Sequence, residues 1–347
     1  YLLCHNATGK MSGWQSTPDS ISMLALRMLG AGNGSAIADV CCGTGNFLKT
    51  AAAHCLGASL TGMEISAEAA CVAKMRSAVI GGDIDILQCD ALDSGAKFRG
   101  KFDYVFCDPP YAMPLEHIHC LINTNGEMRT LFFPSTFPSL RGRATSEWVW
   151  LLKAIEMLKP DGKAAILVPL GRMFSTSQES QYRRYLVENG HVESVVALPG
   201  GLLDYSGIRL ALVILSRGNS DIRLIDADGL CVKRRGGNTM TEAHVDRIVG
   251  AKPDDGICRL VSSSEIAANE FSLDPASYGR ELPDVPNAVP LSEVVTSIGR
   301  GMAFGKDGEE DIPEDAPARL VTVSDISDGR IADELKSPLG EVVGYKV

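Results

Sequence analysis

A four-residue stretch, Asp108-Pro109-Pro110-Tyr111, combines groups that could do chemistry on a flat ring carrying an amino group. It follows the apolar run 102–107, whose β-branched and aromatic residues predict a short buried strand. Two prolines in succession remove two N–H donors and fix φ, so the chain after Asp108 is stiff and non-helical. The turn therefore offers a carboxylate and carbonyls to accept amino hydrogens, and an aromatic face for stacking. The alternative is a proline turn in which the acid is incidental.

A second stretch, residues 36–48, is typical of a nucleotide-binding loop. An apolar run ends near Asp39 and is followed by Gly43-Thr44-Gly45, whose glycines let a ligand approach the backbone closely. A lone Gly-x-Gly is a weak motif, and Leu48 replaces the third glycine of the dinucleotide fingerprint. A carboxylate at Asp39 would repel a pyrophosphate but suit a cation, which favours S-adenosylmethionine over NAD. A generic α/β loop is the alternative.

Acidic residues end four successive predicted strands. Asp39 and Asp108 end the first and fourth, Glu64 ends the second, and Asp90 ends the third. An acid at the position of Glu64 binds the ribose hydroxyls of an adenosine in doubly wound folds, and Asp90 is placed to accept from an adenine amine. We therefore expect the four acids to line one ligand site, because a random acidic chain would not place them so regularly.

The elements that must position these residues follow from the apolar pattern. Thr17-Pro18-Asp19 predicts a helix start with threonine as the N-cap, and the helix runs to Gly30. A later helix is predicted to bury one face. That face consists of Trp148, Leu151, Leu152, Ile155 and Leu158. Further strand-like runs at 163–168, 193–198 and 209–216 complete a predicted seven-stranded, mostly parallel sheet.

The composition is that of an ordinary globular chain, with 45% hydrophobic and 22% charged residues among 347. No apolar run reaches membrane-spanning length, and no signal-peptide pattern opens the chain. Ten cysteines without a C-x-x-C spacing predict free thiols in a reducing cytoplasm. His117, His119 and Cys120 have no further ligand group nearby in sequence, so no metal site is predicted. The net charge of −10 argues against indiscriminate nucleic-acid binding, though not against a local basic groove.

Taken in order, the motifs resemble those of the amino-DNA methyltransferases, and among these the modification subunits of type I restriction-modification systems and their fused relatives. The motifs are Thr17-Pro18, Asp39-Val-Cys-Cys-Gly-Thr-Gly-Asn-Phe47, Gly62-Met-Glu64-Ile65, Asp90-Ala-Leu92 and Asp108-Pro-Pro-Tyr111. The likeness covers most of residues 13–280. It implies an α/β, Rossmann-like S-adenosylmethionine-dependent methyltransferase fold with a small C-terminal extension.

The resemblance also implies roles for individual residues. Asp108, Pro109, Pro110 and Tyr111 would be catalytic, and no metal would take part. The implied cofactor site for S-adenosyl-L-methionine consists of Thr17, Pro18, Asp39, Cys41, Cys42, Gly43, Thr44, Gly45, Asn46, Phe47, Glu64, Ile65, Asp90, Ala91 and Asp108.

Two positions depart from the family pattern. The family usually has asparagine where this chain has Asp108, and proline-alanine where it has Val40-Cys41. The aspartate form occurs in other amino-methyltransferases, so the chemistry survives. Adenine N6 and cytosine N4 both stay open as the acceptor, and the family favours adenine.

The implied function is site-specific methylation of adenine N6 in double-stranded DNA, within a prokaryotic restriction-modification or related defence system and away from any membrane. The base would rotate out of the duplex, because its amine cannot reach the methyl donor while stacked. Tyr111 would stack on it, Phe47 would lie on the cofactor side, and Asp108 and the Pro109 carbonyl would accept from the amine. The implied partners are a specificity subunit or fused target-recognition domain, with a restriction subunit as a further candidate.

Alternatives from other classes stay open. One is a methyltransferase acting on RNA, protein or a small molecule, and another is an inactive cofactor-binding scaffold in a defence complex. A dinucleotide-dependent oxidoreductase is disfavoured by Asp39 and Leu48.

Four segments are expected along the chain. They are an N-terminal segment with a cofactor-side helix (1–30), the catalytic domain (31–217), its C-terminal extension (218–285) and a partial target-recognition-like segment (286–347). Within the catalytic domain, residues 112–144 are too long for a plain connection and predict a flap over the base or the DNA backbone, although ordinary loop packing explains them equally well. Basic residues that could contact phosphates are Arg141, Arg143, Arg172, Arg183, Arg184 and Lys233-Arg234-Arg235, with a solvated surface role favoured for any single one.

Overall fold

The computed structural model describes residues 16–93, 95–111, 146–175, 179–203, 207–234, 237–253, 255–278, 289, 326–327 and 330–331. The chain divides into two compact units, Tyr1–Glu281 and Leu282–Val347. The second unit contains a two-stranded antiparallel sheet of β10 (Ile326–Ser327) and β11 (Arg330–Ile331). The division into four functional segments stays a prediction.

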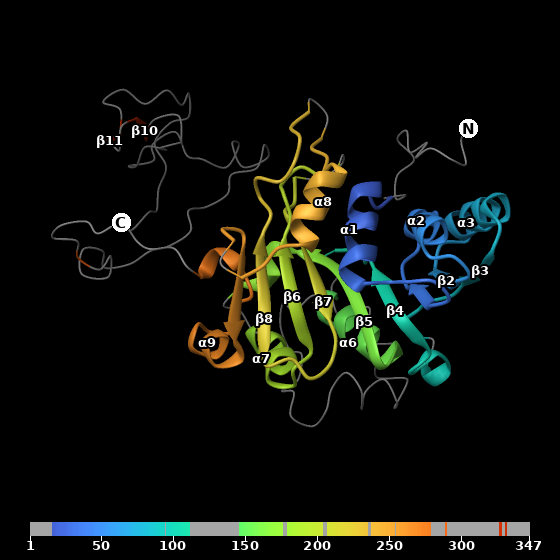
Figure 1. Cartoon of the computed structure of the whole chain (residues 1–347), viewed down its shortest axis with the longest axis horizontal. Coiled ribbons are helices and arrows are strands. Elements are labelled where there is room, and N and C mark those ends of the chain that lie inside the picture. Colours follow the sequence, from blue (N-terminus) through green and yellow to red (C-terminus); the bar gives the residue numbers. More distant parts are fainter. Residues whose placement is uncertain are drawn as a thin grey trace, which may run out of the picture. The chain divides into compact units, whose positions relative to one another are not determined.

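A nine-stranded sheet forms the centre of the described part of the first unit, in the order β3-β2-β1-β4-β5-β7-β6-β8-β9 (Figure 1). Its strands are β1 (Ala36–Asp39), β2 (Ser59–Glu64), β3 (Asp83–Gln88), β4 (Phe102–Cys107), β5 (Leu158–Pro169), β6 (Val192–Ala197), β7 (Leu210–Leu215), β8 (Asp221–Asp226) and β9 (Cys258–Ser262).

Strand directions make this sheet mixed. Strands β3, β2, β1, β4 and β5 are parallel, and so are β6 and β8, whereas β7 is antiparallel to both β5 and β6, and β9 to β8. The predicted seven-stranded, mostly parallel sheet was therefore wrong in strand number. The segment predicted as an extension supplies β8 and β9. A short connection, residues 216–220, joins β7 to β8, and short connections reverse strand direction because a parallel crossover needs about a dozen residues.

Helices cover both faces of the sheet (Figure 1). They are α1 (Asp19–Leu29), α2 (Asn46–His54), α3 (Ala67–Ile80), α6 (Glu147–Met157), α7 (Ser180–Glu188), α8 (Glu242–Val249) and α9 (Ser263–Ala268), with short 3₁₀ helices η1 (Gly95–Phe98), η2 (Leu170–Met173) and η3 (Pro275–Ser277). Alternate strand residues divide between two apolar cores: Ile37 and Phe106 face the core of α1, α2 and α8, whereas Ala38 and Val105 face that of α6 and α7.

Helix α6 is buried on nearly every side. Besides its apolar residues it buries Glu147, Lys153 and Glu156, and the Lys153 ammonium lies 3.0 Å from the Glu156 carboxylate. The prediction of one buried face was therefore too narrow, because an internal ion pair lets charged residues occupy positions that the apolar pattern leaves to solvent.

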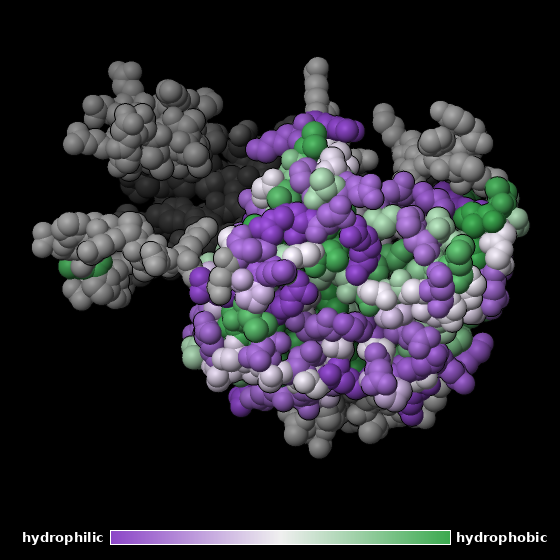
Figure 2. Space-filling view, in the orientation of Figure 1, coloured by the Kyte–Doolittle hydropathy of each residue, from purple (hydrophilic) through white to green (hydrophobic). Residues whose placement is uncertain are grey.

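The described surface seen in Figure 2 is largely hydrophilic. Hydrophobic side chains gather over α3 and its surroundings, where Leu56, Met75 and Val79 are exposed. Among the described residues, no helix is both long and apolar enough to cross a membrane.

Candidate active site

The four predicted strand-end acids lie at one edge of the sheet. Asp39 and Glu64 are the last residues of β1 and β2, Asp90 follows β3, and Asp108 follows β4. These four strands are parallel neighbours, so their carboxyl ends meet. The chain order of the strands reverses between β1 and β4, and open α/β sheets bind ligands at such a switch point.

Asp108 is held by two hydroxyl groups. Thr17 Oγ1 donates to Asp108 Oδ2 at 2.6 Å, and the Tyr111 hydroxyl donates to Oδ1 at 2.5 Å. Burial of the carboxyl raises the pKa of Asp108, whereas the two donors lower it because they stabilise the charged form. The hydroxyls therefore favour the carboxylate where burial favours the neutral acid.

This arrangement corrects one prediction and adds a contact to another, and the predicted stacking of Tyr111 on a base stays a prediction. Thr17 does not cap α1, since the N-cap residue is Pro18 and no side chain caps the helix there. The Thr17 hydroxyl is bonded to Asp108 instead, across 91 residues of chain. Tyr111, predicted to stack on a base, uses its hydroxyl on the same carboxylate.

One of the two proline carbonyls in the Asp-Pro-Pro-Tyr turn already accepts a hydrogen bond within the protein. The Pro110 carbonyl accepts from Ser146 Oγ at 3.4 Å, which ties the turn to the start of α6. No hydrogen bond from another described residue reaches the Pro109 carbonyl. The predicted role of the Pro109 carbonyl, to accept a hydrogen bond from the target amine, therefore stays a prediction.

Asp39 is the most deeply buried acid of the edge, with 2% of its surface exposed. Burial raises the pKa of Asp39 well above its ordinary value, and the negative charges of Asp108 and Glu64 raise it further, against a hydrogen bond from the Cys41 N–H. A positively charged ligand would favour the ionised form of Asp39, which burial and the two neighbouring acids disfavour.

Glu64 connects the glycine loop to the end of β2. Its Oε2 accepts from the Gly43 N–H at 2.9 Å, and its Oε1 accepts from the Ser66 N–H at 2.7 Å. The next residue, Ile65, has 69% of its surface exposed although it is hydrophobic. An acid beside an exposed apolar side chain suits a ribose with a flat base next to it.

Asp90 and Ala91 follow β3 at the same edge. Asp90 Oδ1 accepts from the Leu92 N–H at 2.9 Å, which fixes its carboxylate. Ala91 has only 3% of its surface exposed, so its methyl group belongs to the core.

The glycine loop turns sharply between β1 and α2. Gly43 and Gly45 have φ of +51° and +83°, and the Gly45 N–H donates to the Cys42 carbonyl at 2.7 Å. Gly62 in β2, which has no predicted role beyond opening a motif, lies beneath this loop. A Cβ there would meet Leu48 Cδ1 at 2.7 Å and Cys42 Sγ at 2.9 Å. Close packing of loop and strand thus depends on Gly62, in a chain where Leu48 replaces the usual third glycine.

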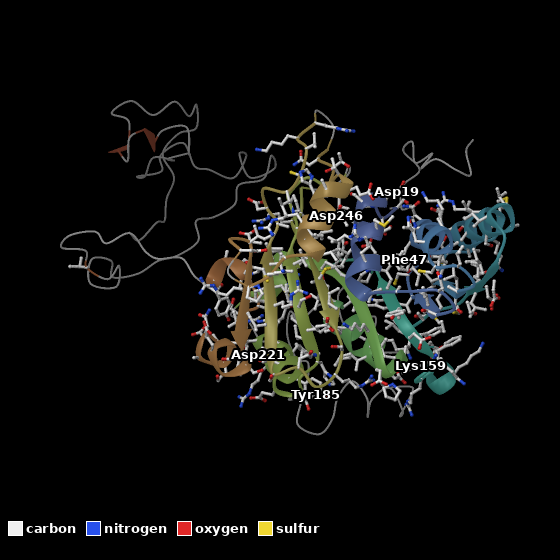
Figure 3. The ribbon with its side chains drawn as sticks, in the orientation of Figure 1. Asp19, Phe47, Lys159, Tyr185, Asp221 and Asp246 are labelled. Carbon is white, nitrogen blue, oxygen red and sulfur yellow. The ribbon has the colours of Figure 1, made fainter. Side chains whose placement is uncertain are left out.

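Asn46 connects the loop to the N-terminal segment. Its side-chain amide donates to the Thr17 carbonyl at 2.6 Å and to Asp19 Oδ1 at 2.8 Å, and Lys49 also donates to Asp19. Figure 3 labels Asp19 at the start of α1. Asn46 therefore holds the segment that carries the Thr17 hydroxyl.

Two predicted cofactor contacts are core side chains. Phe47 has 1% of its surface exposed and stacks on Phe106 of β4 at 4.1 Å between ring centroids, so its ring supports the strand that carries Asp108 (Figure 3). Cys42 is also buried. Both residues can meet a ligand only through their backbone.

The cysteines of this edge are thiols in the protein interior. Cys107 Sγ lies 3.9 Å from Cys41 Sγ, and burial raises the pKa of both. Within the described residues, no group of three or more His, Cys, Asp or Glu side chains could hold a metal ion. The predicted flap at 112–144, together with His117, His119 and Cys120, lies outside those residues.

The sequence also missed Arg76 of α3. This buried guanidinium lies 3.5 Å from Thr44 Oγ1, beneath the glycine loop. No local pattern marks it, because the contact depends on how α3 packs against α2.

Comparison with known proteins places this geometry in a family. The chain is 25% identical to the type I restriction enzyme MjaIX methylase subunit of Methanocaldococcus jannaschii, over 82% of this chain and 55% of that protein. It is 25% identical to the HindI methylase subunit of Haemophilus influenzae, over 84% of this chain and 69% of that protein. The chain therefore spans a little over half of the first relative and about two thirds of the second.

A solved structure agrees with the sequence comparison. The type I restriction-modification system methyltransferase subunit from Streptococcus thermophilus superposes with a TM-score of 0.69 and 25% identity, covering 78% of this chain and 60% of that one. The predicted methyltransferase fold is thus confirmed, with the strand number corrected. The family model described as N-6 DNA Methylase matches residues 1–283, so the resemblance read from the motifs is confirmed and the chain belongs to the N-6 DNA methylase family.

Proposed function

We propose that this chain is the catalytic part of a DNA adenine-N6 methyltransferase that works as a modification subunit. The observation that carries the proposal is the position of Asp108, whose carboxylate is held by two hydroxyls at the end of β4, beside the acid-lined switch point. The named relatives are type I methylase subunits, which supports the same activity.

The residues of the edge fit S-adenosylmethionine, which supplies a methyl group on a positively charged sulfur. A sulfonium would favour the ionised form of Asp39, which burial and the neighbouring acids Glu64 and Asp108 disfavour, whereas a pyrophosphate would disfavour it further. Glu64 and Asp90 would bind the adenosine part, with Ile65 against its base. The backbone of Gly43 and its neighbours would approach the methionine part.

Asp108 acts on the target amine. The amine nitrogen of adenine is a weak nucleophile because its lone pair is delocalised into the ring. Hydrogen bonds from the amine to Asp108 and to the Pro109 carbonyl localise that lone pair and offset the positive charge that grows as the methyl group arrives. A carboxylate can also take the proton that the methylated nitrogen must lose, which an asparagine cannot.

Thr17 and Tyr111 orient Asp108, and their hydrogen bonds favour its ionised form against burial, which raises its pKa. Flipping the base out of the duplex brings its amine to the carboxyl edge, because the amine is inaccessible within the stack. Specificity for a DNA site would come from a specificity chain or from residues 286–347, with a restriction subunit as a further partner. Because the proposed substrate is DNA, we also propose that the enzyme works in the cytoplasm of a prokaryotic cell.

The test is methyl transfer from tritiated S-adenosylmethionine to DNA, with and without a candidate specificity chain. Asp108→Ala should lower incorporation by at least about 100-fold and leave cofactor binding, measured by calorimetry, nearly unchanged. Mass analysis of nucleosides from the product separates adenine N6 from cytosine N4. Incorporation into RNA but not DNA, or unchanged transfer by Asp108→Ala, would reject the proposal.

A further inference from the structure

A basic hairpin projects from the described part of the first unit, between β8 and α8. We use the name for residues 232–234 and 237–239, joined by the backbone pair Val232 and Thr239, whose N–H groups donate to each other's carbonyls at 2.8 and 3.1 Å. Lys233 and Arg234 of the hairpin are exposed. They begin the only run of three consecutive basic residues in a chain of net charge −10.

The hairpin lies at the same edge of the sheet as Asp108. Strand β8 runs parallel to β6, and β6 and β5 are each antiparallel to β7, so β8 points in the same direction as β5 and β4. The chain therefore enters the hairpin from the carboxyl end of β8. Figure 1 shows this hairpin above the strands, on the side where α1 begins.

The spacing along this edge matches a length of duplex DNA. Four strand steps separate β4 from β8 in the sheet order. At about 4.8 Å a step, the two strand ends lie roughly 19 Å apart. That distance corresponds to about six base pairs at roughly 3.4 Å each.

One residue, Asn238, anchors the hairpin to the turn that follows β6. Asn238 donates from its amide to the Gly200 carbonyl at 2.7 Å and from its backbone N–H to the Gly201 carbonyl at 2.6 Å. Both glycines belong to the turn that follows β6. Anchoring reduces the entropy lost when the charged residues of the hairpin bind a ligand.

Among the described residues, the other predicted phosphate contacts already have partners within the protein. Arg172 pairs with Glu179, Arg184 pairs with Glu188, and Arg183 is buried and donates to backbone carbonyls. At the same edge, Arg209 pairs with Asp228 at 3.1 Å. Lys233 and Arg234, by contrast, form no ion pair with any residue that the structure describes.

We propose that the basic hairpin binds phosphates of the duplex that flanks the flipped base. This inference rests on the proposed function, which puts the target base at Asp108 and thereby lays the duplex along the carboxyl edge. Exposed cations without an ion pair among the described residues, on an anchored hairpin that follows a strand end about half a helical turn from that of β4, suit the regular negative charge of a DNA backbone. The contact adds affinity and register without reading sequence.

The experiment compares duplex binding by the full chain and by the double variant Lys233→Gln/Arg234→Gln. Fluorescence anisotropy with a labelled duplex gives the slope of log K against log salt from about 50 to 200 mM. Losing two phosphate contacts should reduce the slope by about 1.8 and weaken binding by tens of fold near 0.1 M salt. Calorimetry should show unchanged S-adenosylmethionine binding.

The matched control is Lys97→Gln/Lys101→Gln. These lysines are exposed, precede β4 in the chain, and form no ion pair with described residues. The control removes the same charge and should leave the slope unchanged. An unchanged slope in the hairpin variant, an equal fall in the control, or no duplex binding by the unmodified chain would overturn the proposal.

Two further outcomes distinguish the phosphate contact from binding of an acidic protein and from the proposed methyl transfer. If the hairpin variant loses binding to polyglutamate but keeps its duplex slope, the hairpin binds an acidic protein and the proposal is wrong. If the slope falls as expected but S-adenosylmethionine gives no heat, the proposed methyl transfer fails while the phosphate contact stands.

Discussion

At the scale of single residues, the carboxylate of Asp108 determines which side chains can hydrogen-bond to it. An asparagine would present one acceptor and one donor, whereas the carboxylate accepts a hydroxyl on each oxygen. Thr17 and Tyr111 therefore match an aspartate, and the departure from the usual asparagine comes with partners suited to it.

Tyr111→Phe should shift the pH dependence of methyl transfer. Removing the hydroxyl removes a donor to the ionised form, so the pKa of Asp108 rises. Because the carboxylate is the active form, the rising limb of the rate profile moves to higher pH. On its acid side the rate falls by roughly tenfold or more, the cost of one hydrogen bond to a charged group.

The control is Tyr104→Phe, which removes a hydroxyl from β4, the strand that precedes the Asp-Pro-Pro-Tyr turn. Tyr104 donates to the Gly30 carbonyl at 3.2 Å, away from Asp108. Its pH profile should match that of the unmodified chain. A parallel shift in both variants would show that Tyr111 acts through general stability.

The effects of Asp108→Asn and Tyr111→Phe should not add. In the asparagine variant one oxygen becomes an amide donor, so one hydroxyl already lacks its acceptor. Removing the Tyr111 hydroxyl should then lower kcat/KM less than it does in the unmodified chain. The four proteins of the cycle give this coupling directly, and additive losses would show that the two side chains act independently.

At the scale of elements, the glycine loop depends on the strand beneath it. Gly62→Ala should lower the free energy of unfolding by about 1–3 kcal/mol, because the new methyl group overlaps Leu48, Ile86 and Cys42. It should also weaken S-adenosylmethionine binding by displacing the loop. Urea unfolding and calorimetry measure the two effects.

Gly32→Ala is the control for this substitution. A Cβ at Gly32 meets no atom within 4 Å, and its φ lies outside the left-handed region. Its stability should change by less than about 0.5 kcal/mol. Equal losses at both glycines would contradict the packing argument.

Some features of the strands and loops could be predicted from the sequence, and others could not. Apolar runs ending in acids placed Asp39, Glu64, Asp90 and Asp108 at one edge, because strand direction follows from chain order in a βα repeat. The reversed direction of β7 was not predicted, since side-chain alternation is the same in parallel and antiparallel strands. The contact between Thr17 and Asp108 and the need for Gly62 depend on tertiary packing, which no local pattern records.

At the scale of the whole molecule, Arg183 joins the last elements of the first unit to the rest. Its buried guanidinium donates to the carbonyls of Arg172, Ser175 and Phe271 at 2.9, 2.6 and 2.8 Å. Phe271 and Glu270 before it both have positive φ, at 56° and 52°. The chain after α9 is thus held to α7 and η2 in a backbone conformation that non-glycine residues rarely adopt.

Arg183→Met should destabilise the whole unit by about 3 kcal/mol or more, because three carbonyls lose their donor in a buried site. Arg184→Met is the control. Arg184 is exposed, and its ion pair with Glu188 contributes less than about 1 kcal/mol. Denaturant midpoints compare the two, and similar losses would show that the buried arginine contributes no more than a surface one.

The crowding of negative charge around Asp39 has a consequence for the catalytic cycle. Donation of the methyl group turns a cationic sulfonium into a neutral thioether, so the spent ligand is attracted less by Asp39, Glu64 and Asp108 than the fresh one. Under the proposed function, the side chains that attract the fresh methyl donor therefore hold the by-product less strongly, which favours its exchange for a new donor.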